Sequence, residues 1–262
     1  MPIKISGGIS YFYFSRLADQ GFKNGFFMRY GGVSPHPWQS LNHATSVGDS
    51  RENIVENRKR SLKALELEFN SVFDVWQVHG DKVVVADSPR PIDQPHQKAD
   101  AILTKNQEIT LLMLFADCVP IFLVDPIRQV FSIAHAGWKG TLNNVAGKAA
   151  KRMIKEFHSS PEQVEAYIGP CICQDHYQVG QEVVEALDEK MPNARVLDSR
   201  ESGYYLDLPK ANQINLQKMG VKKIFSSGIC TSCNNADWFS HRAENGKTGR
   251  YAAILAVNDE AR

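Results

Sequence analysis

The stretch Ile109-Thr-Leu-Leu-Met-Leu-Phe-Ala-Asp-Cys-Val-Pro-Ile-Phe-Leu-Val124 is the longest apolar run in the chain. Asp117 and Pro120 interrupt this run, which argues against a membrane-spanning helix, and each half has the length of a buried strand. We therefore predict two core strands, at about 109–115 and 121–124, joined by a turn. This turn carries Cys118 at the edge of the hydrophobic core.

Apolar runs separated by turn residues continue on both sides of these two strands. Further strands are predicted at about 25–29, 72–78, 83–86, 130–135, 164–168, 224–226 and 251–257. Helices are predicted from a cap at Asp49-Ser50 to about 67, over 141–157, over 180–187, and from Pro209 to just before Gly220. Strands and helices follow no regular βαβ rhythm, so we predict an α+β fold with mixed sheets. We expect one compact domain over residues 1–262.

The charge balance argues against a polyanionic partner. The chain has 30 Lys and Arg against 29 Asp and Glu, a net charge of +1, and no basic stripe. We therefore expect neither a nucleic acid nor a membrane as partner, but a small substrate. The first residues lack the apolar core of a signal peptide, and five cysteines suggest no disulfide pattern. Both features predict a cytoplasmic protein.

Three residues with metal-binding side chains lie where strand-like runs break into turns. They are His79 in Val-Trp-Gln-Val-His-Gly, Cys118 in Leu-Phe-Ala-Asp-Cys-Val-Pro, and His135 in Phe-Ser-Ile-Ala-His-Ala-Gly-Trp. Imidazole and thiolate are ligands that zinc prefers, and three protein ligands leave one position open for reactants. A single histidine or buried cysteine is usually structural. The shared setting of all three favours a catalytic metal site.

The remaining cysteines, Cys171, Cys173, Cys230 and Cys233, leave two interpretations open. Cys230-x-x-Cys233 has a common zinc-ligand spacing, whereas Cys171-x-Cys173 is less typical. We favour free thiols over a second, closed zinc site. A base-editing type of deaminase is excluded, because the chain has no His-x-Glu and no Pro-Cys-x-x-Cys.

Short motifs resembling those of one family appear in order along nearly the whole chain. They are Arg29-Tyr-Gly-Gly-Val-Ser34, Ser40-Leu-Asn42, Val47-Gly-Asp49, Asn57-Arg58, Gln77-Val-His79-Gly80, Ala99-Asp100-Ala101, Ala116-Asp-Cys118-Val-Pro120, Ala134-His-Ala-Gly-Trp-Lys-Gly140, Ile168-Gly-Pro170, Tyr177-Gln-Val-Gly180 and Thr248-Gly-Arg250. The pattern resembles the YfiH-type laccase-domain family, which is labelled polyphenol oxidase and understood as purine nucleoside phosphorylases.

The resemblance implies a catalytic zinc held by His79, Cys118 and His135. It also implies an α+β fold related to the toxin deamidases, which use a Cys-His pair. The implied activities are phosphorolysis of adenosine, inosine and methylthioadenosine, and deamination of adenosine. Two positions depart from the family pattern: Met28 stands where Thr is usual, and His43 where an apolar residue is common. Both departures concern substrate preference rather than the metal site.

Four further residues are candidates for the chemistry. Arg29 and Arg250 can each offer a guanidinium to phosphate, and Asn42 can hydrogen-bond the ribose or the base. Asp117 is the carboxylate nearest to Cys118 in sequence, suited to orienting a ligand histidine or to moving a proton.

Two other classes of enzyme remain open. A copper-dependent phenol oxidase is disfavoured because the chain has eight histidines but no His-x-His pair, although His/Cys/His also suits a single copper. A metal-free hydrolase or amidase would use Cys118 as nucleophile and His135 as base. We expect purine nucleosides and phosphate as ligands, and a monomer or homodimer.

Overall fold

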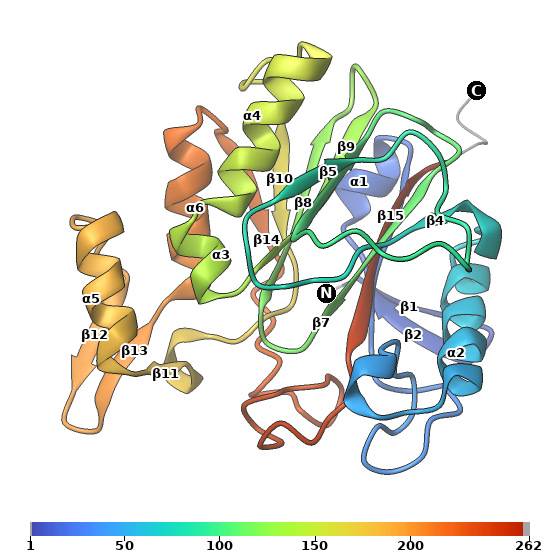
Figure 1. Cartoon of the computed structure of the whole chain (residues 1–262), viewed down its shortest axis with the longest axis horizontal. Coiled ribbons are helices and arrows are strands. Elements are labelled where there is room, and N and C mark those ends of the chain that lie inside the picture. Colours follow the sequence, from blue (N-terminus) through green and yellow to red (C-terminus); the bar gives the residue numbers. More distant parts are fainter. Residues whose placement is uncertain (1, 259–262) are drawn as a thin grey trace.

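Two six-stranded mixed sheets form the centre of the computed structural model, which describes residues 2–258 (Figure 1). In spatial order, the first sheet consists of β1 (Ile3–Ser6), β2 (Ile9–Phe12), β3 (Phe22–Phe27), β15 (Tyr251–Val257), β7 (Thr110–Phe115) and β4 (Val72–Phe73). The second consists of β14 (Lys223–Ser226), β10 (Glu165–Ile168), β8 (Val119–Asp125), β9 (Val130–Ala136), β6 (Ala101–Thr104) and β5 (Val83–Val85). A small third sheet has the order β11 (Gln178–Val179), β13 (Gly203–Leu206) and β12 (Leu197–Arg200).

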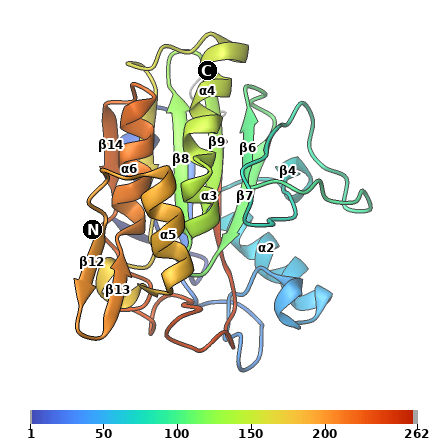
Figure 2. The ribbon, with the colours of Figure 1, turned by 60° about the vertical axis from the view of Figure 1, so that its left-hand side comes forward.

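Helices pack around the two large sheets. They are α1 (Ser15–Asp19), α2 (Arg51–Ala64), α3 (Trp138–Leu142), α4 (Val145–Phe157), α5 (Gln181–Lys190) and α6 (Leu208–Lys218). Helix α2 lies beside the first sheet, while α3, α4, α5 and α6 gather on the side of the second (Figure 2). Within residues 2–258, every helix is too short or too polar to cross a bilayer.

The main core lies between the two sheets, where Phe26 of β3 stacks on Phe122 of β8 with ring centroids 4.5 Å apart. Strand β8 is buried along its whole length, because alternate residues face this core and the core beneath the helices. Burial on both faces explains why its sequence is continuously apolar rather than alternating.

The predicted class is confirmed, because parallel pairs such as β4–β7 and β10–β14 occur within mainly antiparallel sheets. The two strands predicted around the Cys118 turn appear as β7 and β8, which lie in different sheets, and the strand predicted at 251–257 is β15. Ser50 caps α2 as expected, since its side chain accepts from the amide of Asn53. We predicted one domain of a single family over residues 1–262, and this stays a prediction.

Two predicted elements differ in the structure. The helix predicted over 141–157 is divided into α3 and α4, because Asn144 adopts a left-handed conformation and its side chain caps α4 at Gly147. The strand predicted over 72–78 ends at Phe73. Beyond it, the side-chain amide of Gln77 pairs with both backbone groups of Leu114, so a side chain replaces the backbone ladder there.

Candidate active site and metal centre

The structure brings the three predicted metal ligands together. Candidate ligand atoms of His79, Cys118 and His135 all lie within 4.8 Å of one another. Cys118 lies in the β7–β8 turn, and His135 is the last residue but one of β9. His79 lies in an irregular loop rather than at a strand end, and its ring stands edge-on to that of His135 with centroids 4.8 Å apart.

The backbone around the cluster is tightly constrained. In the β8–β9 register Pro120 lies opposite His135, which places Cys118 next to the turn that follows β9. A Cβ atom at Gly137 would lie 3.0 Å from the Cys118 sulfur and 3.1 Å from the His79 ring. Glycine is required at this position because the two side chains approach the backbone so closely.

Asp100 connects two of the three candidate ligands. Its carboxylate lies 2.8 Å from Nδ1 of His135 and accepts the backbone N–H groups of Val78, His79 and Gly80 at 3.2, 3.0 and 2.7 Å. A carboxylate that accepts Nδ1–H leaves Nε2 of His135 facing the cluster, and such a partner commonly orients a metal-bound histidine. Asp100 is fully buried, so it fixes both the histidine ring and the His79 loop.

The cluster favours an ionised thiolate beside an imidazolium. Burial alone would raise the pKa of Cys118, but the charge of His135 and hydrogen bonds from both imidazoles lower this pKa. Burial alone would lower the pKa of His135, but the Cys118 charge and the hydrogen bond to Asp100 raise it. A ready thiolate serves equally as a soft metal ligand and as a nucleophile.

The cluster lies in a cavity of about 480 Å³, within the usual range for small-ligand sites. Besides the cluster, its lining includes Trp138, Tyr177, His241, Arg242 and Arg250. The cavity therefore places two guanidinium groups and several aromatic rings around the metal-ligand cluster. Planar bases stack on such rings, while anions pair with such cations.

Arg250 is held in the cavity by buried neighbours. Asn42 accepts the backbone N–H of Arg250 at 2.9 Å, and the backbone N–H of His43 donates to the Arg250 carbonyl at 3.0 Å. The His43 imidazole is fully buried against Ser61, and burial together with the Arg58 charge lowers its pKa to about 3. Asn42 is also fully buried and is not among the cavity residues, so it contacts the backbone of Arg250 rather than a ligand.

The structure places Arg29 outside this cavity. Its guanidinium donates to the carbonyls of Gln39 and Asn235 and to Glu244, and it lies over the ring of Phe239. These contacts tie the segment after β3 to the long loop 227–250. Phosphate binding by Arg29 stays a prediction, and this arrangement does not favour it.

Asp117 borders the cavity but has other partners than those we predicted. Its carboxylate accepts the hydroxyl of Thr231 at 2.7 Å and the backbone N–H of Arg242 at 2.6 Å. The carboxylate that contacts a ligand histidine is that of Asp100. Asp117 thus anchors the loop that carries His241 and Arg242, while a role in proton transfer stays a prediction.

Sequence reasoning missed several of these residues. Asp100 received no role, although an acidic residue directly before the apolar run Ala101-Ile-Leu103 is a signal. His241 and Arg242 lie in no predicted element, and nothing in their spacing indicates that they reach the cavity. His176, three residues after Cys173, was overlooked although Cys-x-x-His is a zinc-ligand spacing.

The comparison with known proteins identifies the family of the chain. A family model described as multi-copper polyphenol oxidoreductase laccase matches residues 23–258. The chain belongs to this laccase-domain family. Among curated members of the family, the purine nucleoside phosphorylase YlmD of Geobacillus stearothermophilus is 35% identical over 247 residues, covering 90% of each chain. Purine nucleoside phosphorylase of Deinococcus radiodurans is also 35% identical, over 242 residues and 92% of each chain.

Another relative bears the name of a different activity. Adenosine deaminase RL5, from an unknown prokaryotic organism, is 31% identical over 224 residues, which cover 81% of this chain and 85% of the relative. The crystal structure of YlmD from Geobacillus stearothermophilus superposes with a TM-score of 0.91 at 31% identity, covering 98% of this chain and 99% of the other. The Bacillus licheniformis protein YfiH gives a TM-score of 0.89 at 29% identity with the same coverage. The α+β fold is thus shared with YlmD and YfiH, whereas the relation to toxin deamidases stays a prediction.

Proposed function

We propose that this chain is a zinc-dependent purine nucleoside phosphorylase acting on adenosine, inosine and methylthioadenosine, with adenosine deaminase activity. The observation that carries the proposal is the cluster of His79, Cys118 and His135 in a cavity that also contains Arg250. Relatives named purine nucleoside phosphorylase and adenosine deaminase support the two activities. We also retain the expectation of a cytoplasmic monomer or homodimer.

The donor set fits zinc. Two imidazoles and a thiolate are ligands that zinc prefers, the thiolate is favoured by its neighbours, and Asp100 orients one imidazole. Zinc held by three protein ligands would keep its fourth coordination position open, and it would supply Lewis acidity at the reacting centre. His79, Cys118 and His135 would hold the ion.

Phosphorolysis requires that phosphate be held while the base departs. The C1′–N9 bond of the nucleoside breaks, a phosphate oxygen bonds to C1′, and the departing purine takes up a proton. Arg250 is suited to hold phosphate. Three of its five N–H donors hydrogen-bond to Thr248, Gly249 and His241, and within residues 2–258 the other two have no hydrogen-bond partner and can donate to phosphate oxygens. Burial and the Arg250 charge lower the pKa of His241, which favours the neutral imidazole in the cavity.

Deamination of adenosine would use the same cavity differently. Water adds at C6 of the purine and ammonia leaves, so phosphate takes no part. The deaminase name of one relative favours this second activity. We assign it to the same three ligands, with Asp117 or His241 as candidates for moving the proton.

Two alternative functions have their own support. The family description names copper, although no His-x-His pair occurs in the sequence. The thiolate–imidazolium pair of Cys118 and His135 also suits a metal-free hydrolase or amidase. The metal requirement and the products separate these alternatives from our proposal.

The test is product analysis with each of the three nucleosides, with and without phosphate, alongside the metal content of the purified protein. We expect free base and ribose 1-phosphate only with phosphate, and inosine from adenosine without phosphate. Chelation and Cys118→Ala should abolish both reactions, whereas Cys171→Ala, which removes a buried thiol outside the cluster, should keep them. Full activity of metal-free protein would favour the hydrolase, and oxygen uptake with phenols would favour the oxidase.

A further inference from the structure

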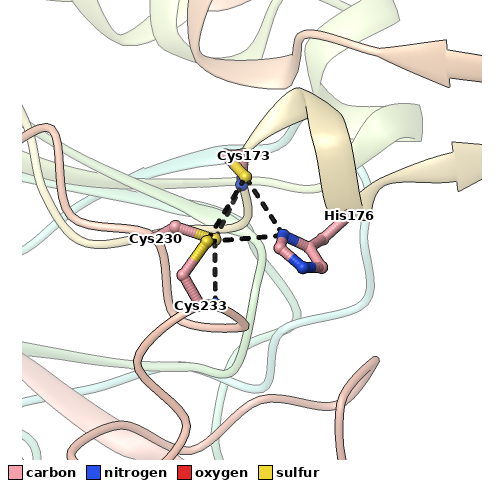
Figure 3. Close-up of side chains that lie close together, drawn as sticks. All are labelled: Cys173, His176, Cys230 and Cys233. Atoms are coloured by element: carbon pink, nitrogen blue, oxygen red, sulfur yellow. Dashed lines mark hydrogen bonds between the residues drawn. The ribbon is translucent and has the colours of Figure 1, made fainter.

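A second cluster of metal-binding side chains lies apart from the His79–Cys118–His135 cluster. Cys173, His176, Cys230 and Cys233 have candidate ligand atoms within 4.8 Å of one another, and the four side chains converge on one point (Figure 3). Cys173 and His176 lie at the 3₁₀ turn Gln174–His176 after β10, and the other two lie in the loop after β14. These two loops are neighbours because β10 and β14 pair in parallel.

The separations between the ligand atoms match a tetrahedral site. The sulfur of Cys173 lies 3.3 Å from Nδ1 of His176 and 4.0 Å from the sulfur of Cys233, which is itself 3.4 Å from Nδ1. With Zn–S bonds of about 2.3 Å and a Zn–N bond of about 2.0 Å, tetrahedral ligand atoms lie roughly 3.5–3.8 Å apart. The two sulfurs at 4.0 Å are too distant for a disulfide bond, which needs about 2.05 Å.

The backbone also supports a thiolate at Cys230. The N–H groups of Cys173 and Cys233 both point at its sulfur, at 3.3 and 3.4 Å. Such donors stabilise a coordinating thiolate and fix the orientation of its side chain. The spacing Cys173-x-x-His176 supplies two ligands from one turn, and Cys230-x-x-Cys233 supplies two from the other.

From this arrangement we infer that Cys173, His176, Cys230 and Cys233 form a closed structural zinc site. Three thiolates and one imidazole are a recurrent structural zinc set, and four protein ligands leave no position for a substrate. Soft thiolates select zinc over magnesium, calcium or manganese. The inference takes up the second zinc site that the sequence left open beside free thiols, with His176 in place of Cys171.

Cys171 is excluded from the site by its backbone environment. It is buried beneath the helices and forms a parallel β-bridge with Cys230, exchanging backbone hydrogen bonds with Ile229 and Thr231. The fourth ligand is therefore His176, one turn after Cys173, rather than Cys171.

The inferred zinc would fasten the wall of the catalytic cavity. The first loop carries Ile172 and Tyr177, which line that cavity, and the second leads to His241 and Arg242, which line it too. The guanidinium of Arg242 donates to the carbonyl of His176 at 2.9 Å, so the second loop contacts a ligand residue directly. A metal joining the two loops would hold this wall without touching the substrate.

The inference does not depend on the proposed activity, and metal counting tests it separately. The wild-type protein should contain two zinc equivalents, Cys118→Ala should retain one, and the double variant Cys230→Ser/Cys233→Ser, which leaves only two ligands, should retain one. Cys171→Ser, the matched control thiol, should keep both. The inference is overturned when Cys118→Ala contains no metal, or when Cys230→Ser/Cys233→Ser contains as much metal as the wild type.

Cobalt substitution identifies the ligands in the folded protein. Cys118→Ala refilled with Co²⁺ should show the sulfur-to-cobalt charge-transfer and intense tetrahedral bands of a thiolate-rich site. Adding His176→Cys should preserve these bands, whereas adding Cys230→Ser/Cys233→Ser should abolish the charge-transfer band and lower the thermal midpoint. Should this variant fail to fold, the spectrum of Cys118→Ala alone decides. A featureless spectrum, or an intact mass showing a Cys173–Cys233 disulfide, would refute the site.

Discussion

The carboxylate of Asp100 lies 2.8 Å from Nδ1 of His135, and the same carboxylate accepts three successive backbone N–H groups from the His79 loop. One buried acid thus determines the orientation of one candidate ligand and the position of another. The β6–β9 register explains the contact, because Ala101 lies directly opposite Ala134 and brings the preceding Asp100 beside His135.

Replacing Asp100 by Asn should weaken metal binding and activity without removing a ligand. Loss of a ligand-orienting carboxylate typically costs 10–100-fold in metal affinity or activity, and we expect a loss of about that size. Titration of apo-protein with zinc, together with kcat/KM for adenosine phosphorolysis, measures both effects. Asp188→Asn on the exposed face of α5 is the control. Unchanged metal affinity in Asp100→Asn would contradict the role assigned here.

Gly137→Ala should disturb the cluster while leaving the fold intact. The added Cβ would lie 3.0 Å from the Cys118 sulfur and 3.1 Å from the His79 ring, so both ligands must shift. A small misplacement of catalytic groups can reduce the rate about 100-fold, and we expect a loss of at least about tenfold in kcat. Steady-state kinetics and the thermal midpoint measure the two properties. Normal kinetics in the variant would show that the cluster tolerates the displacement.

Arg250→Lys should raise KM for phosphate more than it lowers kcat. Lysine keeps the positive charge but loses the planar fork that pairs with phosphate oxygens, and an effect of about tenfold is expected. Arg152→Lys on α4, outside the cavity lining, is the matched control. An unchanged KM for phosphate would assign the anion to another cation of the cavity, such as Arg242.

Glu165→Gln should make the free energy of unfolding less dependent on pH in the acid range. The Glu165 side chain is only 1% exposed, and burial alone would raise its pKa. Hydrogen bonds from Arg16, Tyr167 and Gln20 outweigh burial and lower the pKa to about 2. Because the folded-state pKa lies below the unfolded value of about 4.3, the carboxylate stabilises the fold above that pH. This contribution is lost as the pH falls towards 2.

Urea unfolding of wild type and Glu165→Gln between pH 7 and pH 2 checks this expectation. The wild type should be more stable at pH 7 by about 1–2 kcal/mol, a range reduced because the Arg16 side chain is 51% exposed. The difference should shrink as the pH falls through the interval between the two pKa values. Glu201→Gln, at an exposed position, should track the wild type throughout. A constant difference across the pH range would contradict the linkage.

Local sequence signals located most of the secondary structure. Apolar runs predicted β7, β8, β9 and β15, and Ser50 marked the start of α2. The short strands β12 and β13 escaped prediction because they are only partly buried and carry little apolar pattern. The interruption between α3 and α4 depends on the left-handed conformation of Asn144, which residue periodicity does not reveal.

The sequence by itself determined the chemistry of the donors: two histidines and a cysteine in turns beside buried strands, and a Cys-x-x-Cys pair elsewhere. Only the tertiary structure decided which groups meet. It placed Asp100 rather than Asp117 at His135, His176 rather than Cys171 at the second cluster, and Arg250 rather than Arg29 in the cavity. The physical reason is that strand register and loop packing bring together residues far apart in the chain, and neither is encoded in the spacing of the ligands alone.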